Sequence, residues 1–204
     1  MRKIAFVALA AAAALAAAAP APADAVVGQP APAFTLTDSH GKSHSLASFQ
    51  GKTVVLEWWN HECPFVAKHY GSGNMQKLQK EWTGKGVVWL TVNSSAPGKQ
   101  GHVDAAKATA LMKEKGGAAT AVLRDHDGTV GKAYGAKTTP HMFVIDAKGK
   151  LVYAGGIDDK PSTDQADVPT AKNHVSAALA EVLAGKPVTT ATSAPYGCGV
   201  KYAD

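Results

Sequence analysis

The stretch "VVLEWWNHECPF" (residues 54–65) joins a continuous apolar run to a cysteine that is followed directly by proline. The run "TVVLEWW" (53–59) favours a strand that is buried on both faces. Proline is common in the first turn of a helix, so a helix is expected to begin near Cys63 and Pro64. The cysteine therefore lies at a strand-to-helix corner, where unpaired backbone N–H groups favour a thiolate.

A cysteine in this position is a candidate nucleophile, because a helix N-terminus lowers the pKa of a thiol. His61 could add positive charge or accept a proton, whereas Glu62 would oppose the shift. The alternative is that Cys63 is a small buried hydrophobic residue. The adjacent proline and the export signal described below favour reactivity.

The second cysteine, Cys198, lies 135 positions later in "APYGCGVKY" (194–202), between two glycines that suit a flexible arm. Such an arm could resolve an intermediate on Cys63. Alternatively, the pair is a permanent staple, worth roughly 5 kcal/mol for a loop of about 135 residues. In either case a Cys63–Cys198 disulfide is expected rather than two free thiols, unless the two cysteines belong to different subunits.

The N-terminus is typical of a cleaved signal peptide over residues 1–25. Arg2 and Lys3 precede an apolar segment (4–19), and "ADA" (23–25) fits the small-x-small rule for cleavage. A membrane anchor is the alternative, but the segment is short and its alanines are only weakly hydrophobic. We expect cleavage after Ala25 and a periplasmic or secreted protein without a stable membrane anchor, in a compartment where disulfides persist.

Residues 26–204 are sufficient for one domain, with residues 186–204 as its C-terminal arm. The chain has 21 basic and 16 acidic residues, and its lysines are scattered rather than gathered in runs. This pattern predicts a solvated surface and no nucleic-acid partner.

Strand and helix patterns alternate along the chain. Strands are expected at 34–38 and 44–49 as a hairpin, and at 53–59, 86–94, 120–125, 142–146 and 151–156. Helices are expected from Cys63, over 74–82 and 102–116, briefly within 128–135, and over 169–184. This order predicts an α/β fold with a mixed central sheet covered by helices on both faces and an N-terminal β-hairpin.

Several segments together resemble the thioredoxin-fold superfamily, in its redoxin (alkyl-hydroperoxide-reductase/thiol-specific-antioxidant) branch. They are "VVLEWWNHECPF", "TTPHMFVID" (138–146), "VLRDHDGTVGKAYGA" (122–136) and "AKGKLVYAGG" (147–156). "ECPFVAKHYGSGNMQKLQ" (62–79), "GGIDDKPST" (155–163) and "YGCGVKY" (196–202) resemble an exported, peroxiredoxin-like bacterial group. The resemblance implies a thioredoxin-like three-layer sandwich and an antioxidant or thiol-disulfide oxidoreductase activity.

The resemblance also implies roles for particular residues. Cys63 matches the attacking cysteine, and Pro140 matches the cis-proline that faces it, with Thr139 beside the substrate. Glu57 matches a buried acid that handles protons behind the cysteine, although a surface carboxylate is the alternative. Position 66 is valine, so a C-x-x-C pair is absent.

The chain departs from true peroxiredoxins at three points. Their proline and threonine before the reactive cysteine are replaced by Leu56 and Asn60. Asn60 can still donate a hydrogen bond, but it supplies no hydroxyl. The peroxide-polarising arginine is missing, because Arg124, the one arginine after the leader, lies outside that motif.

A metal site is a further alternative, with His61, His69 and His141 as ligands beside the cysteines. His69 is expected on the helix surface instead. Asp158 and Asp159 could bind a cation, but they are expected to shape the loop before the last helix.

The preferred interpretation is an exported redoxin in which Cys63 attacks and Cys198 resolves. Its substrate would be a peroxide or a protein disulfide, and its partner an external thiol reductant such as a thioredoxin-like protein. No organic cofactor and no metal are required. The alternative is a non-enzymatic metal- or partner-binding protein with a structural Cys63–Cys198 disulfide.

Overall fold

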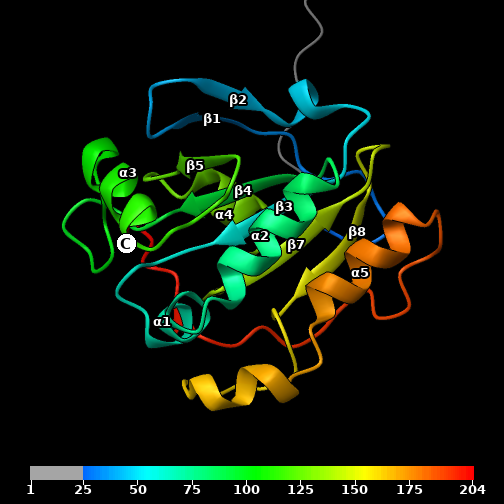
Figure 1. Ribbon diagram of the computed structural model, residues 1–204. Helices are drawn as coiled ribbons and strands as arrows, with labels where there is room; N and C mark the ends of the chain where they lie inside the picture. The colour runs from blue at the N-terminus through cyan, green and yellow to red at the C-terminus, as the bar shows by residue number, and fades with distance from the viewer. Residues whose placement is uncertain (1–24) are drawn as a thin grey trace, which may run out of the picture.

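A computed structural model describes residues 25–204 (Figure 1). The predicted signal peptide lies outside the described residues, apart from Ala25. A seven-stranded sheet forms the centre of the fold, in the order β2-β1-β5-β4-β3-β7-β8. Its strands are β1 (Thr35–Asp38), β2 (Ser43–Ser45), β3 (Val54–Trp58), β4 (Val88–Asn93), β5 (Ala121–Arg124), β7 (His141–Ile145) and β8 (Leu151–Gly155).

The sheet is mixed, as the sequence predicts. β3, β4 and β5 are parallel, whereas β7 runs antiparallel to β3 and places His141 opposite Trp58. β3 is buried over its whole length, and alternate residues enter different cores. Val55 belongs to one core cluster and Leu56 to the other.

Helices cover both faces of this sheet, and the predicted α/β sandwich is confirmed. They are α1 (Pro64–Gly71), α2 (Asn74–Gly84), α3 (Ala105–Glu114), α4 (Thr129–Ala133) and α5 (His174–Leu183). Figure 1 shows α2 and α5 in front of the sheet and α4 behind it. No helix in the described part of the chain is long and apolar enough to cross a membrane.

Two predicted elements are shorter than expected because polar side chains cap the backbone. The strand predicted over 44–49 is instead β2 (Ser43–Ser45), which pairs with β1, and a 3-10 helix, η1 (Leu46–Phe49), follows it. The Ser45 hydroxyl accepts from the N–H of Ser48, which begins that helix. Similarly, Asp104 caps α3, so the helix begins at Ala105 and not at residue 102.

The predicted helix 169–184 is divided into two. Residues Gln165–Thr170 form a separate 3-10 helix, η2, which contains Pro169. α5 begins only at His174, after Asn173, whose side chain accepts from the N–H of Ser176 at 2.7 Å. The loop between β8 and α5 is therefore longer than expected, and η2 lies against α1.

The C-terminal arm, residues 186–204, is laid along the body of the domain. In Figure 1 it passes from α5 to α1 and ends beside α3. It contains a strand that the sequence did not predict, β9 (Cys198–Gly199), which pairs with β6 (Thr138–Thr139). Beyond β9, the carbonyl of Lys201 accepts from the N–H of Ala96 at 2.8 Å, and the Tyr202 hydroxyl donates to the carbonyl of Ala136. The expected flexible arm is thus docked in this structure.

Candidate active site

Cys63 is the residue immediately before α1, and its side chain is completely buried. The loop from β3 positions it, because the N–H of Cys63 donates to the carbonyl of Asn60 and Pro64 begins the helix. As a thiol, Cys63 donates to the carbonyl oxygen of Thr139 at 3.0 Å. The strand-to-helix corner predicted from the sequence is therefore present, but it is covered.

The C-terminal arm covers Cys63. β9 runs antiparallel to β6 and places Cys198 opposite Thr139, next to the Cys63 sulfur. The Thr139–Pro140 peptide bond is cis, as the resemblance implied. Both cysteines are free thiols, so the structure corresponds to the reduced form, and the expected Cys63–Cys198 disulfide stays a prediction.

The two thiols have pKa values shifted in opposite directions. Burial raises the pKa of Cys63, but hydrogen bonds from the Cys198 thiol, from the N–H groups of Val66 and Cys198, and from the Thr139 hydroxyl outweigh burial and hold it below its ordinary value. The sulfur makes no capping hydrogen bond of ordinary geometry with α1. Burial, followed by the hydrogen bond to Cys63, raises the pKa of Cys198 to about 11. The pair is thus polarised, with negative charge favoured on Cys63.

Glu57 is fully buried on the same side of β3 as the cluster that contains Cys63, which excludes the surface alternative. Its carboxylate accepts from Tyr70 at 2.9 Å, from Gln79 at 3.0 Å and from the Trp89 indole at 2.8 Å. Burial raises the pKa of Glu57 in spite of these bonds. A carboxyl whose pKa is raised in this way can hold or release a proton nearer to neutral pH.

Asn60 and His61 shape the loop before Cys63. The Asn60 side chain accepts from the N–H of Glu62 at 2.9 Å, and it fills the space against Gly101, where a Cβ would overlap it. The His61 ring lies against Trp59, with ring centroids 5.7 Å apart, and burial lowers its pKa. Neither side chain makes a hydrogen bond to the Cys63 sulfur.

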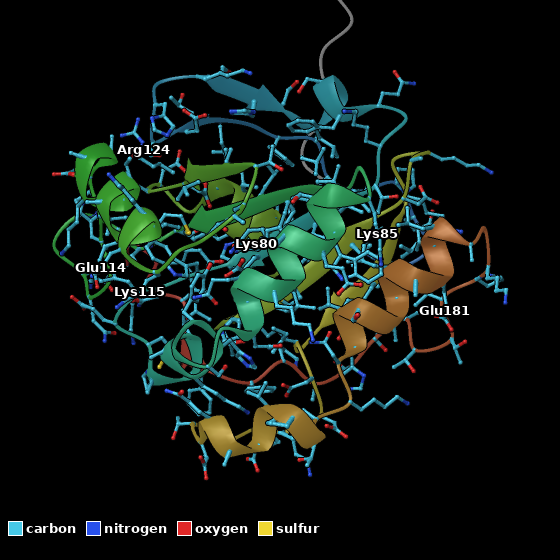
Figure 2. The ribbon with its side chains drawn as sticks, viewed as in Figure 1. Lys80, Lys85, Glu114, Lys115, Arg124 and Glu181 are labelled. Atoms are coloured by element: carbon cyan, nitrogen blue, oxygen red, sulfur yellow. The ribbon has the colours of Figure 1, made fainter. Side chains whose placement is uncertain are left out.

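The structure also places the positions that depart from peroxiredoxins. Leu56 is buried in the core on the opposite side of β3 from Glu57. Arg124 lies in β5, separated from β3 by β4. It lies opposite Thr37 of β1, and Figure 2 shows its side chain on the side of the molecule where α3 lies and away from α1. No cationic side chain therefore replaces the missing arginine among the described contacts of Cys63.

The histidines that suggested a metal site have separate surroundings. His141 accepts from the N–H of Lys137 at 3.2 Å, and burial lowers its pKa to about 4. Within residues 25–204, no three His, Cys, Asp or Glu side chains come close enough together to hold a metal ion. The ligand set suggested by the sequence is therefore not assembled in this structure.

The prediction that His69 lies on the helix surface is wrong, because its side chain is completely buried. It contacts the hydroxyl of Tyr196, which also donates to Asp158. The sequence contained a signal for this, since Val66 and Tyr70 define the buried face of α1 and position 69 shares that face. Asp158 and Asp159 shape their loop as expected, by accepting from the N–H groups of Lys160 and Lys172.

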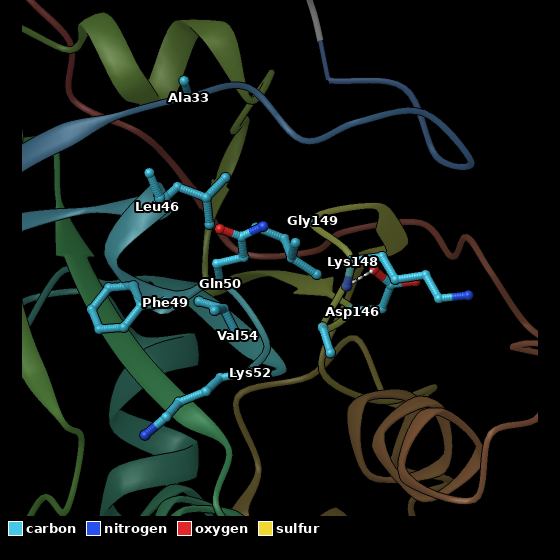
Figure 3. Close-up of a pocket in the computed structure, with 12 residues that line it drawn as sticks. Ala33, Leu46, Phe49, Gln50, Lys52, Val54, Asp146, Lys148 and Gly149 are labelled. Carbon is cyan, nitrogen blue, oxygen red and sulfur yellow. Dashed lines mark hydrogen bonds between the residues drawn. The ribbon is translucent and has the colours of Figure 1, made fainter.

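A cavity of about 280 Å³ lies at the opposite end of β3 from Cys63. Its lining includes Leu46, Phe49 and Val54, together with Asp146 in the turn after β7 (Figure 3). Val54 begins β3 and Cys63 follows the end of that strand, so this cavity is separate from the thiol pair. Lys52 and Lys148 stand at its rim in Figure 3.

Comparison with known families identifies the chain. The redoxin family matches residues 26–175, which include Cys63, Thr139 and Pro140. The chain belongs to the redoxin family. Its match ends before the arm, so Cys198 lies outside the matched region.

Several relatives of this redoxin are named as thiol-disulfide oxidoreductases or interchange proteins. ResA of Geobacillus thermodenitrificans is 30% identical over 125 residues, which cover 61% of this chain and 66% of the relative. The thiol:disulfide interchange protein DsbE of Pseudomonas fluorescens biotype C is 31% identical over 137 residues, which cover 66% of this chain and 70% of the relative. This redoxin thus spans about two thirds of the length of these relatives. They support a thiol-based redox function, and the narrower peroxiredoxin-like grouping stays a prediction.

Two solved structures resemble this redoxin over most of its length. A hypothetical protein from Sinorhizobium meliloti 1021 is 28% identical with a TM-score of 0.70, covering 87% of this chain and 95% of that one. An uncharacterized conserved protein from Geobacillus kaustophilus is 25% identical with a TM-score of 0.73, covering 87% and 93%. These matches confirm the fold over a larger part of the chain than the curated relatives cover.

Proposed function

We propose that this redoxin is an exported thiol-disulfide oxidoreductase in which Cys63 attacks and Cys198 resolves. The observation that carries the proposal is the position of β9. It places Cys198 opposite Thr139, whose carbonyl oxygen lies 3.0 Å from the Cys63 sulfur. The ResA and DsbE relatives support the same class of reaction.

In the proposed reaction, the Cys63 thiolate attacks one sulfur of a substrate disulfide. A mixed disulfide forms, and the other substrate sulfur leaves as a thiolate that takes up a proton. Cys198 then loses its proton and attacks the Cys63 sulfur, which forms the Cys63–Cys198 disulfide and releases the reduced substrate. Two electrons pass to the substrate, and an external dithiol, such as a thioredoxin-like protein, restores the pair. The cysteines carry these electrons without a cofactor.

The opposite pKa shifts of the two thiols support these roles. Cys63, with the lowered pKa, supplies the nucleophile, and Cys198 remains a protonated donor until the mixed disulfide has formed. Thr139 and Pro140 form the backbone edge that faces the reacting sulfurs. Glu57 would exchange the proton from behind the site, and Asn60 and His61 would hold the loop that presents Cys63.

The site favours disulfide over peroxide as the oxidised substrate. Asn60 uses its side-chain oxygen within the loop, and Arg124 lies two strands away from β3 in the sheet order. Neither a hydroxyl from position 60 nor a guanidinium is therefore available to polarise a peroxide. Peroxide is the alternative substrate, and the following experiment compares the two.

The test is stopped-flow fluorescence of the reduced protein mixed with a disulfide peptide or with hydrogen peroxide. Trp59 shares a core cluster with Cys63 and should report its oxidation. We expect the protein to react with the disulfide peptide about 10-fold faster than a free thiol of ordinary pKa does. Its reaction with hydrogen peroxide should be no faster than that of the free thiol. Mass spectrometry should locate a Cys63–Cys198 disulfide in the product.

Two variants separate the roles of the cysteines. Cys63→Ser should abolish turnover, and Cys198→Ser should accumulate the mixed disulfide on Cys63. Full turnover by Cys63→Ser would contradict the enzyme proposal. A Cys63–Cys198 bond that thioredoxin-like dithiols fail to reduce would instead support the non-enzymatic alternative with a structural disulfide.

Export belongs to the same proposal and is tested separately. The protein recovered from the periplasm of a bacterial host should begin at Val26. An intact Met1 on protein in the cytoplasm would contradict export.

A further inference from the structure

Tyr196, two residues before Cys198, places its hydroxyl between two buried polar side chains. The hydroxyl donates to Oδ1 of Asp158 at 2.6 Å and lies 3.1 Å from Nε2 of His69. The side chains of His69 and Asp158 are 0% and 1% exposed. Both belong to the body of the domain and not to the arm, so the pocket does not depend on the arm for its walls.

The hydrogen bonds in this pocket have a fixed direction. The Asn74 amide nitrogen, which can only donate, lies 2.9 Å from Nδ1 of His69. His69 therefore carries its proton on Nε2 and donates it to the Tyr196 hydroxyl. Burial lowers the pKa of His69 to about 4, so the ring is neutral near pH 7. The pocket thus offers one donor and one acceptor to a single hydroxyl group.

The rest of the pocket fits an aromatic ring. Phe65 packs edge-on against Tyr196 with ring centroids 5.9 Å apart. The Lys68 ammonium lies 5.7 Å from the centre of the ring and is held by the carbonyl of Lys160 at 2.8 Å. The pocket therefore binds an aromatic ring at one end and a hydroxyl group at the other, which is the pattern of a phenol.

The arm has to leave this place when Cys63 reacts with a partner, because the Cys63 side chain is completely buried beneath it. Its departure removes the hydroxyl from His69 and Asp158. Oδ2 of Asp158 already lacks a hydrogen bond, so the emptied pocket would hold further unsatisfied polar atoms. A partner that supplies another phenol hydroxyl would restore these bonds.

We propose that the arm occupies the position of a substrate segment, and that this redoxin selects extended segments with a tyrosine two residues before the reactive cysteine. Such a segment would pair with β6 as β9 does and place its tyrosine between His69 and Asp158. The inference rests on the proposed function. In the covalent step, the Cys63 thiolate bonds to the cysteine sulfur of the segment, and the sulfur previously bonded to it leaves as a thiolate.

The test uses three hexapeptides in which the cysteine is bonded to a thionitrobenzoate leaving group. One has the sequence of residues 194–199, Ala-Pro-Tyr-Gly-Cys-Gly, and the others carry phenylalanine or alanine in place of tyrosine. Release of the leaving group is followed by absorbance with the full-length protein. With the reduced protein in excess, a single turnover gives the second-order rate constant for release of the leaving group. We expect this constant to be about 10-fold higher for the tyrosine peptide than for the phenylalanine peptide, with alanine slower still.

Two variants test whether the pocket causes this preference. His69→Phe removes the donor and should reduce the tyrosine-to-phenylalanine ratio to about 2-fold. The ratio is unaffected by any loosening of the arm, because loosening would accelerate all three peptides together. His102→Phe makes the same substitution at a histidine whose ring contacts Ser95 and His126, and it should preserve the preference.

The possible failures are distinguishable. Equal rates for the three peptides, all well above that of a free thiol, would overturn the tyrosine pocket and leave the proposed function standing. Rates no higher than that of a free thiol would overturn both. A third outcome is a Cys63–Cys198 disulfide between two protein molecules that forms in preference to reaction with the peptides. It would assign the substrate position to the arm of a second copy of the chain and overturn the proposal of a separate substrate segment.

Discussion

Cys63 and Cys198 are chemically identical residues whose surroundings give them opposite acidities. Cys63 is completely buried and Cys198 is half-buried beside it, but Cys63 receives hydrogen bonds and Cys198 donates one. These surroundings therefore favour ionisation of Cys63, the sulfur that is expected to attack, over ionisation of Cys198. The sequence predicted the reactive position of Cys63 but not this polarisation, which depends on the docking of β9.

The polarisation predicts a two-step titration of the reduced protein. Absorbance at the thiolate wavelength should show one thiol ionising below the ordinary cysteine pKa, and a second near pH 11. In Cys198→Ala the second step should disappear and the first should move upward, because the donor to Cys63 is lost. A first step that stays in place would show that the arm does not stabilise the Cys63 thiolate.

A second prediction at the residue scale concerns how Glu57 makes stability depend on pH. Its pKa in the folded state is raised above the ordinary value of 4.5 by burial, so the stability that it contributes is present below that value and is lost as pH rises through the raised pKa. Glu57→Gln has no proton to lose. The variant should be less stable by about 1–3 kcal/mol in acid, where its amide pairs poorly with the Trp89 indole, and the deficit should shrink as pH rises.

Urea denaturation of reduced protein from acidic to mildly alkaline pH measures this change. Glu81→Gln, at an exposed position on α2, is the control and should show no such trend. A deficit that grows with pH would mean that burial does not raise the pKa of Glu57.

At the scale of the element, the arm determines access to the site. Gly197 has φ of +144°, and a Cβ there would overlap the carbonyl oxygen of Thr139. Gly197→Ala should therefore weaken the pairing of β9 with β6 and increase the rate of Cys63 alkylation by about 10-fold. Gly199→Ala is the matched control, because a Cβ there meets its nearest atom, in Lys137, at 4.0 Å. Equal alkylation rates for the two variants would contradict the view that β9 covers Cys63.

The elements also show what the sequence could and could not specify. Apolar runs and glycine or proline boundaries located the long strands and α1 to α3, because burial and capping are local signals. The short strand β9 has no such signal. Its two residues, Cys198 and Gly199, pair only because the chain returns to Thr139 from far along the sequence. The burial of His69 could have been read from the helix face that it shares with Val66 and Tyr70, but its partners Tyr196 and Asp158 are distant in sequence and have no local signal.

At the scale of the whole molecule, the disulfide would link the arm to the body. A strain-free link over a loop of this length would stabilise the fold by roughly 5 kcal/mol. For a redox-active pair we expect a smaller gain, about 1–2 kcal/mol, because the reduced fold has thiolate hydrogen bonds that the disulfide lacks. Urea denaturation of oxidised and reduced protein gives the difference. A gain near the upper figure would favour a permanent staple.

The global architecture was the most predictable feature, because the alternation of strands and helices leaves few arrangements for a mixed sheet. The identity of the substrate was the least predictable. In our proposal it depends on the pocket of Tyr196, which three segments of the chain form together, and no single motif contains it.

The docked arm also has a consequence for biogenesis. Residues 186–204 follow every helix and all seven strands of the main sheet, so the body can fold before the arm arrives. During that interval Cys63 has no cover and no partner thiol. A newly made chain would therefore pass through a brief period in which surrounding thiols and disulfides can react with Cys63, and docking of the arm would end that period.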